Sequence, residues 1–465
     1  MKRFTTPLLL AALGLATPAL AQTTTFPVGA VTVSVTPLAT GLAVPWELVW
    51  GPDNFIWMTE RGGRISRVNP TTGQVTALLT VPDVTPTGES GLLGMVLHPD
   101  FATSPYVYIV YNYTPSGSGL KEKLVRYTYS NATLTAPLVL LDNITATTTH
   151  SGSRLLILPD RTLLMTTGDS QLASEAQNPA SLNGKILRLN LDGTIPANNP
   201  TPGSRVYTLG HRNPQGLVLA SNGKLYSSEH GPNNDDEVNL IEVGRNYGWP
   251  NVEGFCNLPA EQTFCAANNV REPLAAWTPT LAVSGLKYYD SPAIPGWRGT
   301  LLLNTLKANK LVQLTLNATG DAVTAQADYL TTFGRLRAMC ISPEGRIYIG
   351  TSNRDGSGSP TATDDRILVL ENRAYQPTST AAARNAAPLR LWPNPARQTV
   401  TLRLPAAPAA TPVTIHDALG RLAATGQLAP GQTDLTLSVA GLRAGLYVVR
   451  TQVGTQQYAQ RLVIE

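Results

Sequence analysis

A short unit recurs along much of the chain, and this repetition limits the possible folds more than any other feature. Each copy contains a turn, a short strand, a polar loop and a second strand, and apolar and polar residues alternate along the strands. One such unit cannot bury its apolar face alone, so several copies must stack against one another. The copies begin at Gly51, Leu158, Ser221, Gly296 and Ser342.

Four-stranded sheets around a common axis would bury these copies, so the repetition predicts a β-propeller. Charged residues make up only 14% of the chain, against about 25% in an average globular protein, which is typical here of an all-β fold with many turns. An array of β-sandwiches would show the same alternation. The propeller is favoured because polar residues follow the first strand of several copies and would gather at one end of the axis. These residues are Glu60 and Arg61, Gly168 and Asp169, Glu229 and His230, Lys307, and Asn353 and Arg354.

Residues 1–21 have the pattern of a secretory signal peptide. Two basic residues, Lys2 and Arg3, precede an apolar stretch and an A-x-A-like cleavage site that ends at Ala21. No later apolar run reaches about 18 residues, so we expect an exported protein without membrane insertion. Loss of the two basic residues would lower the formal net charge from +4 to +2, which gives no reason to expect nucleic acid or an anionic membrane as a partner.

The composition of the chain changes near residue 373. Residues 22–372 contain the repeats and are predicted to form the propeller domain. Residues 373–388 contain Ala, Thr and Pro without periodicity, which is typical of a linker. Residues 389–465 are predicted to form a small C-terminal β-sandwich, and they hold no cluster of titratable residues, so we expect no chemistry there.

The chain has three cysteines. Cys256 and Cys265 lie nine residues apart in a loop-like segment rich in Asn and Ala, and a local disulfide between them is predicted for an oxidising compartment. Cys340 lies in an apolar run and is predicted to be a buried structural thiol. Nothing in this set indicates a zinc site.

The stretch from Tyr207 to Pro250 is the densest in candidate functional residues. It places an acidic cluster between bends rich in Gly and Pro, where backbone carbonyls are free to act as ligands. Carboxylate and carbonyl oxygens suit a hard cation such as Ca²⁺. The nearby segment His211-Arg212-Asn213 suits an anionic organic group. These residues therefore indicate a cofactor bridged to a metal, although ordinary polar surface loops would have a similar composition.

Several long motifs follow one another in a fixed order along the chain. They are ESGLLGMVLHPDF, HSGSRLLILPD, TTGD, LNGKILRLNLDGTIPANNP, YTLGHRNPQGL, EHGPNNDDEVNLI, NYGWPNV and RLRAMCISPEGRIYIG. Through these motifs, residues from about 38 to 372 resemble the soluble pyrroloquinoline-quinone-dependent glucose and aldose sugar dehydrogenases. The resemblance implies a six-bladed propeller with pyrroloquinoline quinone and Ca²⁺ at one end of the axis. The short spacing after Asp169 resembles the broad-specificity aldose subgroup.

The resemblance implies three catalytic residues. His150 would act as the general base that takes the proton of the anomeric hydroxyl while hydride leaves the same carbon. Asp169 would hydrogen-bond His150 and fix its tautomer. Arg212 would contact the quinone carbonyl and stabilise negative charge that develops there. Without the resemblance, a buried His–Asp pair is more often structural.

Further residues are implied to bind the cofactor or the metal. Glu89 and His230 stand where the glucose-type enzymes have glutamines, so they are expected near the cofactor with altered sugar preference and pH optimum. The remaining cofactor-binding residues are predicted to be Asn213, Lys307, Arg335 and Arg337. The predicted calcium ligands are Gly231 and Pro232 through their carbonyls, with Asp235, Asp236, Glu237 and the carbonyl of Tyr247 in further sites whose partition is open.

The C-terminal domain resembles the sorting domains recognised by the type IX secretion system. The motifs WPNPA, DALGR and LRAGLYVVR carry this resemblance. It implies the type IX secretion machinery as a partner and a secreted or cell-surface location. Such domains are export addresses.

The expectation from the sequence is an exported quinoprotein that oxidises the C1 hydroxyl of aldose sugars to lactones. Its electrons would pass to an external acceptor. One alternative is a calcium-dependent propeller lactonase or hydrolase, which would need the metal but not the basic residues Arg212, Lys307, Arg335 and Arg337 together. The other is a non-catalytic secreted propeller that binds glycans or proteins, because the fold alone does not decide function.

Overall fold

The structure is a computed structural model that describes residues 23–376, 387–404, 409–417, 420–453 and 456–465. The predicted signal peptide and most of the predicted linker lie outside these residues. The chain forms two compact units. The first is built from the residues up to Glu371, and the second from Asn372–Glu465 together with the short loops Ser291–Pro295 and Ser342–Arg346.

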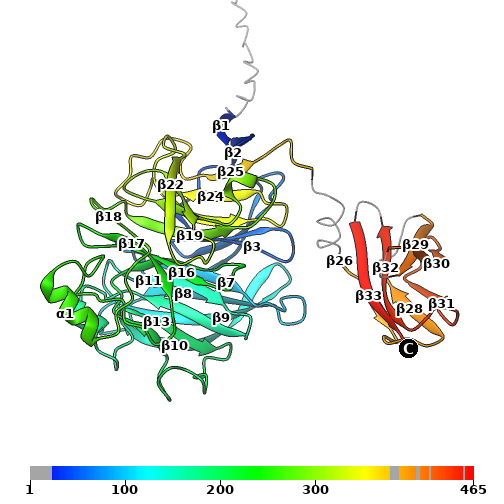
Figure 1. Ribbon diagram of the computed structural model, residues 1–465, viewed down its shortest axis with the longest axis horizontal. Coiled ribbons are helices and arrows are strands. Elements are labelled where there is room, and N and C mark those ends of the chain that lie inside the picture. The colour runs from blue at the N-terminus through cyan, green and yellow to red at the C-terminus, as the bar shows by residue number, and fades with distance from the viewer. Residues whose placement is uncertain (1–22, 377–386, 405–408, 418–419, 454–455) are drawn as a thin grey trace, which may run out of the picture. The chain divides into compact units, whose positions relative to one another are not determined.

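The first unit contains six antiparallel sheets within its described residues (Figure 1). Five of the sheets pair their strands mostly in chain order. The first two are β3 (Pro45–Trp50), β4 (Ile56–Glu60), β5 (Arg64–Val68) and β6 (Val75–Thr80), and then β7 (Leu92–Leu97), β8 (Tyr106–Tyr113), β9 (Lys121–Ser130) and β10 (Thr133–Thr145). The third is β11 (Gly152–Ile157), β12 (Thr162–Thr167), β13 (Lys185–Asn190) and β14 (Val206–Leu209). The fourth is β15 (Pro214–Leu219), β16 (Leu225–Glu229), β17 (Asp236–Ile241) and β18 (Ala275–Trp277). The fifth is β19 (Val283–Tyr289), β20 (Thr300–Thr305), β21 (Leu311–Leu316) and β22 (Val323–Tyr329).

The last sheet joins the two ends of the first unit. Its strand order is β1-β2-β25-β24-β23, so strands from both ends of the unit lie side by side. Ser34 pairs with Glu371 in this sheet, and the Ser34 hydroxyl donates to the Glu371 carbonyl at 3.1 Å. The strands are β1 (Thr24–Val28), β2 (Val31–Ala39), β23 (Leu336–Ile341), β24 (Ile347–Thr351) and β25 (Ile367–Glu371).

The six sheets form a closed ring. The first strands contact one another in the cyclic order β3, β7, β11, β15, β19, β23 and back to β3. Glycine permits these close approaches, since a Cβ atom on Gly94 in β7 would lie 1.9 Å from the carbonyl oxygen of Ser153 in β11. This arrangement is a β-propeller, as the repeats predict.

Each of the six first strands has a β-bulge against the second strand of its sheet. All the bulges occur at the start of the first strand, for example between Pro45 and Glu47 in β3 and between Gly152 and Leu155 in β11. A bulge redirects the side chains beside it. Because the first strands run in one direction around the ring, their bulges lie at one end of the axis, and the residues that precede the strands collect there.

The repeated copies correspond to the second and third strands of their sheets. The copy that begins at Gly51 forms β4 and β5, and the copy that begins at Ser221 forms β16 and β17. The polar residues at the end of each copy's first strand therefore follow β4, β12, β16, β20 and β24. The sheet β7–β10 corresponds to none of the five sequence copies, because its second strand, YVYIVYNY, is almost continuously apolar and buried.

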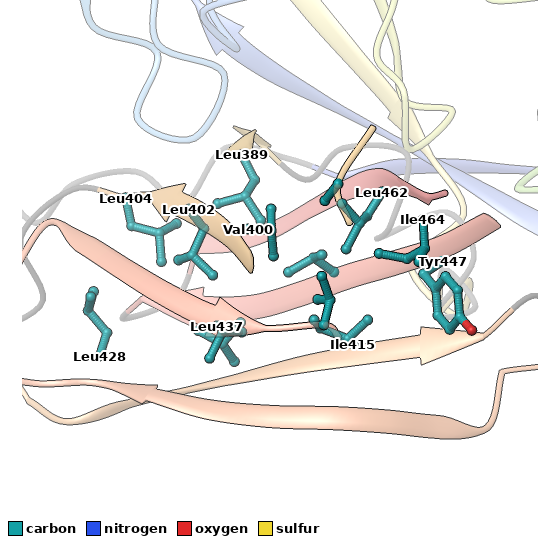
Figure 2. Packing of buried hydrophobic residues seen from close by; sticks show 14 residues of the cluster. Leu389, Val400, Leu402, Leu404, Ile415, Leu428, Leu437, Tyr447, Leu462 and Ile464 are labelled. Atoms are coloured by element: carbon teal, nitrogen blue, oxygen red, sulfur yellow. The ribbon is translucent and has the colours of Figure 1, made fainter. Parts of the chain in front are cut away.

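The second unit contains one five-stranded and one three-stranded sheet in its described residues. Their apolar side chains form a single core that includes Val400, Leu402, Ile415, Tyr447 and Leu462. Figure 2 shows labelled side chains from both sheets pointing into this shared core. The larger sheet has the order β26 (Ala387–Pro388), β33 (Gln456–Ile464), β32 (Gly445–Val453), β29 (Thr411–Asp417) and β30 (Leu422–Leu428), and the smaller has β27 (Arg390–Trp392), β28 (Thr399–Arg403) and β31 (Asp434–Ser438).

One boundary of the predicted linker differs from the structure. Ala387 and Pro388, its last two residues, form β26 and pair in parallel with Tyr458 and Ala459. A linker prediction based on composition cannot detect this pairing, because two residues are too few to show an alternating pattern. Of the sorting-domain motifs, the middle of DALGR (418–419) lies outside the described residues.

The predicted loop that contains two cysteines includes a helix, α1 (Pro259–Ala267). Pro259 occupies the first helical position, and the Glu261 carboxylate accepts from the backbone N–H of Leu258 at 2.9 Å. The prediction of a loop was wrong here because these end signals act together with good helix formers, including Ala260, Gln262 and Ala266. The disulfide between Cys256 and Cys265 is confirmed, and Cys340 is a buried free thiol as predicted.

Two short 3₁₀ helices complete the elements, η1 (Ala173–Ala176) and η2 (Pro295–Trp297). Within the described residues, no helix has the length and apolar character needed to cross a bilayer.

Glu122 in β9 is a buried carboxyl group without a cationic partner among the described residues. It pairs with Asn112 in β8, and both residues are at most 2% exposed. Burial raises the pKa of Glu122 to about 8, although hydrogen bonds with Ser153 and Asn112 oppose this shift. The folded protein therefore holds this carboxyl protonated at pH values where the unfolded chain would ionise it.

Replacement of Glu122 by glutamine is expected to flatten the pH dependence of stability. The folded pKa lies above the ordinary value of 4.5, so the folded state binds more protons and stability falls as pH rises from about 4.5 to about 8, by up to about 1.4 kcal/mol per pH unit. Denaturant unfolding of E122Q and of the parent across this range measures the difference. The exposed control D142N should keep the parent's slope, and an unchanged slope in E122Q would show that Glu122 is ionised in the fold.

Candidate active site

His150 and Asp169 meet at the end of the propeller axis where the bulges lie. His150 precedes β11 with φ +57°, and Asp169 follows β12. The Nδ1 atom of His150 lies 2.8 Å from Oδ1 of Asp169. Asp169 is 1% exposed whereas the His150 side chain keeps 17% exposure. With Nδ1 bound to the carboxylate, Nε2 is the nitrogen left to face a substrate.

Gly168 lets the two segments approach closely. A Cβ atom at this position would lie 1.7 Å from the carbonyl oxygen of His150. The motif TTGD therefore needs glycine before Asp169, because any side chain would push the His150 loop away. The Asp169 backbone N–H donates to the carbonyl of Arg212 at 2.8 Å, which joins this pair to the next sheet.

Arg212 and Asn213 lie in the loop that leads to β15. The Arg212 Nη1 donates to the carbonyl of His230 at 3.1 Å, and its backbone N–H donates to the Glu229 carboxylate. The same carboxylate lies 2.8 Å from Nδ1 of His211, which is fully buried. Burial lowers the pKa of Arg212, and the nearby carboxylates of Asp169 and Glu229 oppose that shift. Arg212 thus stays a fixed, partly desolvated cation.

Arg335, just before β23, and Arg337, within β23, share one acidic partner. Both guanidinium groups approach Oδ2 of Asp355, Arg335 Nε at 2.8 Å and Arg337 Nη2 at 3.6 Å. Burial would raise the pKa of Asp355, but the two arginines outweigh burial and lower it. Burial lowers the pKa of Arg337 to about 10. Gln215 connects this group to Asn213 through bonds of 3.1 Å and 3.3 Å.

Lys307 and Arg335 line a cavity of about 360 Å³. Lys307 is exposed, and its ammonium donates to Thr280 at 3.0 Å. Hydroxyl and charged side chains, among them Thr361 and Arg366, make up much of the remaining lining. A polar cavity with three cationic side chains suits an anionic or hydroxyl-rich ligand.

Glu89 lies close to other residues that the sequence predicts for the active site. Its carboxylate accepts from the backbone N–H of His150 at 3.3 Å. Its charge acts on Arg212, His230 and Arg337, so these three groups lie near the Glu89 carboxylate. Burial lowers the pKa of His230, although Asp236 and Glu89 oppose the shift, so this imidazole is neutral near pH 7.

Three buried polar atoms at this site have no hydrogen-bond partner in the described part of the chain. They are Nε of Arg212, Nδ2 of Asn213 and Nε2 of His230. Buried polar atoms are normally paired, so a cluster of three indicates a place for a polar ligand. Two donors beside a basic wall fit the carbonyl and carboxylate oxygens of pyrroloquinoline quinone.

The predicted acidic calcium ligands do not converge on one point. Asp236 accepts from the backbone N–H groups of Gly231 at 2.9 Å and Val283 at 3.2 Å. Glu237 accepts from Gly254 and Asn239, and Asp235 accepts from Thr278. No group of three or more His, Cys, Asp or Glu side chains among the described residues could hold a metal ion. These carboxylates stabilise the loops around them by accepting hydrogen bonds.

A small cavity of about 20 Å³ lies beside the same segment. Gly231, Pro232, Asp235, Glu237 and Tyr247 all line it, with Glu229 and Glu253 among its other walls. This volume holds about one water molecule or one small ion. Burial, and then the charge of Glu229, raises the pKa of Glu237 well above its ordinary value. Two carboxylates therefore repel each other next to an ion-sized space.

Sequence reasoning missed three side chains that organise the site. Gln215 bonds Asn213 and Arg337, which belong to two different sheets. Trp249 donates to Asp169, and Asp355 pairs with both Arg335 and Arg337. Trp249 lies in the motif NYGWPNV, and Asp355 follows the polar pair after β24, so both positions had a local signal. Gln215 had none beyond its place after Asn213.

The ring of sheets and the polar site at one end define a β-propeller built to hold a ligand on its axis. Residues 42–362 match the glucose/sorbosone dehydrogenase family, and this match covers more than half of the sequence. The chain belongs to that family. Residues 390–465 match the secretion system C-terminal sorting domain, which confirms the predicted sorting domain.

Relatives of known identity support this assignment. The chain is 36% identical to quinoprotein glucose dehydrogenase B of Acinetobacter calcoaceticus, over 72% of this chain and 88% of the relative. It is 33% identical to the aldose sugar dehydrogenase YliI of Escherichia coli strain K12, over 70% and 91%. The solved PQQ-bound aldose sugar dehydrogenase of Streptomyces coelicolor is similar with a TM-score of 0.64 and 35% identity, over 73% of this chain and 98% of that one.

Proposed function

We propose that the protein oxidises the C1 hydroxyl of aldose sugars to lactones with pyrroloquinoline quinone as its cofactor. The observation that carries this proposal is the His150–Asp169 pair, with 2.8 Å between Nδ1 and Oδ1, beside three orphaned polar atoms of Arg212, Asn213 and His230. The sugar dehydrogenases among the relatives support the substrate class.

His150 acts as the general base. Its Nε2 accepts the proton of the C1 hydroxyl, and Asp169 stabilises the imidazolium that results. Asp169 is suited to this role because it is buried and hydrogen-bonded to His150. Loss of the hydroxyl proton makes the C1 hydrogen a better hydride donor. When bound, pyrroloquinoline quinone supplies the hydride acceptor that amino-acid side chains do not provide.

Basic side chains around the axis hold the cofactor. Arg212 and Asn213 would present donors to a carbonyl oxygen of the cofactor, and Arg212 would stabilise negative charge on that oxygen. Lys307, Arg335 and Arg337 would hold its carboxylates. Glu89 and His230 complete the wall nearest the sugar and bear on which aldose is preferred.

The wider architecture is also part of the proposal. The closed contacts of the first strands support six blades formed by residues 22–372. The shared core of the two C-terminal sheets supports a β-sandwich in residues 389–465. The matched sorting domain supports export by the type IX machinery to the cell surface or medium, with electrons passed to an external acceptor.

Ca²⁺ is proposed in the small cavity beside Gly231 and Pro232. Backbone carbonyls are good ligands for Ca²⁺, and a divalent cation would relieve the repulsion between Glu229 and Glu237. The cavity admits one ion of this size. Asp235 and Glu237 would complete the shell.

Chelation is expected to lower both cofactor retention and activity. Dialysis against EDTA should reduce sugar-dependent activity at least about tenfold, since ligand oxygens lose their cation, and Ca²⁺ should restore it better than Mg²⁺. Elemental analysis before and after dialysis measures the metal. Full activity with no bound metal would contradict the calcium site.

The proposed function is tested by reconstitution and product analysis. Purified protein is mixed with pyrroloquinoline quinone and Ca²⁺, and dye reduction is followed on a panel of aldoses with the product identified as lactone. Sugar-dependent dye reduction with a lactone product is expected. Hydrolysis of added lactones without dye reduction would favour a propeller lactonase, and quinone-free sugar binding would favour a glycan-binding propeller.

A further inference from the structure

Trp249 is held firmly between two loops of the site. Its backbone N–H donates to the carbonyl of Gly210 at 3.0 Å, and its own carbonyl accepts from Nε2 of Gln177 at 2.6 Å. The Gln177 side chain also bonds Asn246 at 3.0 Å and 2.8 Å. These contacts fix the loop after β12 to the loop after β17, so the indole has a defined position.

The indole contacts both halves of the candidate site. Its Nε1–H donates to Oδ2 of Asp169 at 2.8 Å. The other carboxylate oxygen, Oδ1, lies 2.8 Å from Nδ1 of His150. The guanidinium carbon of Arg212 lies 5.4 Å from the centre of the Trp249 ring system. Trp249 therefore bonds the residue that orients the base and packs against the cation beside it.

We propose that Trp249 is a positioning residue that sets the orientation of Asp169 toward His150. This inference rests on the proposed function of the site. A hydrogen bond to each carboxylate oxygen leaves Asp169 one orientation, in which Oδ1 faces the imidazole. The loop that carries Asp169 contributes a third bond, because the backbone N–H of Gln171 donates to Oδ1 at 2.8 Å.

An indole suits this place better than a charged donor. A neutral N–H fixes the carboxylate but leaves its negative charge available to the imidazolium. Arg212 is close enough to feel the charge of Asp169, and a direct ion pair would turn the carboxylate away from His150. The aromatic face gives the guanidinium another favourable contact. The Trp249 side chain thus keeps Asp169 and Arg212, which attract each other, from forming a direct ion pair.

The test removes the N–H and keeps a ring. Trp249→Phe is expected to lower kcat for aldose oxidation about tenfold, the value of one hydrogen bond to a charged group, with KM for the sugar little changed. If Trp249 acts through Asp169, the loss should vanish in an Asp169→Asn background, so a double-mutant cycle measures the coupling. An equal loss in both backgrounds would overturn the proposal.

A second measurement needs neither cofactor nor turnover. In the apoprotein labelled with ¹⁵N in its indoles, the Trp249 N–H resonance is identified by its absence in Trp249→Phe. Asp169→Asn is expected to shift this resonance upfield, because a bond to a neutral amide is weaker than a bond to a carboxylate. If the resonance does not shift in Asp169→Asn, the proposed hydrogen bond from Trp249 to Asp169 is wrong. This outcome does not depend on whether sugar oxidation is observed.

Trp57→Phe is the matched control. The Trp57 indole also donates to a carboxylate, that of Asp53, at 3.1 Å, but at the turn between β3 and β4, away from the bulged start of β3. Its loss should leave kcat per folded molecule unchanged. A loss of kcat equal to that of Trp249→Phe would show that removal of any indole–carboxylate bond damages the fold, and would contradict a positioning role.

Discussion

Replacement of His150 by alanine is expected to lower kcat for aldose oxidation about a thousandfold, the usual contribution of a general base. Among the described groups bonded to Asp169, only the His150 imidazole can take the hydroxyl proton, and the His150 side chain is 17% exposed. Alanine leaves the cofactor-binding residues in place, so uptake of the quinone should persist. Steady-state kinetics and a separate binding titration distinguish these two effects.

His98→Ala is the control for this substitution. His98 follows β7, and its Nδ1 accepts from the backbone N–H of Asp100 at 3.1 Å, which is a local structural role. Its loss should not change kcat. A kcat of His150→Ala within about tenfold of the parent would assign the base to another residue.

Replacement of Arg154 by alanine is expected to lower the free energy of unfolding by about 3–5 kcal/mol, because it leaves a buried carboxylate uncompensated. Arg154 in β11 forms an ion pair with Glu47 in β3, and the two side chains are 4% and 3% exposed. The guanidinium also donates to the carbonyl of Gln215 at 2.9 Å and lies 4.4 Å from the ring of Trp46. Chemical denaturation of the parent and the variant measures the loss.

Two further variants separate the charge effect from the loss of packing. Arg298→Ala removes an exposed arginine that pairs with Asp290 at 3.4 Å, and it should change stability by less than about 1 kcal/mol. Removal of both charges in Arg154→Met with Glu47→Leu should recover part of the loss, because neither member of the pair is left buried without its partner. The recovery is incomplete because the charge of Glu47 also acts on the buried Lys287, which this variant leaves in place. Similar losses for Arg154→Ala and Arg298→Ala would contradict a desolvated ion pair on the axis.

The second and third strands of the propeller sheets could be predicted from the sequence better than the first strands. Second strands such as β4 and β16 are fully buried, but each follows a turn rich in Gly, Asn or Asp and ends in polar residues, so their copies are visible as repeats. First strands such as GLLGMVL and PQGLVL are buried on both faces and interrupted by glycine. They lack alternation because neighbouring strands pack on each side, and this packing exists only once the ring is closed.

Individual site residues could be predicted, but the contacts between them could not. Local motifs placed His150, Asp169 and Arg212 at the ends of strands. The bonds that unite them cross the ring, as between Trp249 and Asp169, which are 80 residues apart. The acidic segment shows the same limit. Three consecutive acidic residues predict a cation site, but only Asp235 and Glu237 line the small cavity. Asp236 instead accepts from the backbone N–H groups of Gly231 and Val283, which no local pattern indicates.

The most direct test of the account is an anaerobic titration of the purified apoprotein with pyrroloquinoline quinone in the presence of Ca²⁺, followed by addition of an aldose. Absorbance of the quinone reports binding and reduction in one sample. The proposed function predicts saturable uptake of the quinone by the parent and full reduction of the bound quinone by the sugar. In His150→Ala it predicts uptake without rapid reduction. A parent protein that binds no quinone, or holds quinone that no aldose reduces, would contradict it.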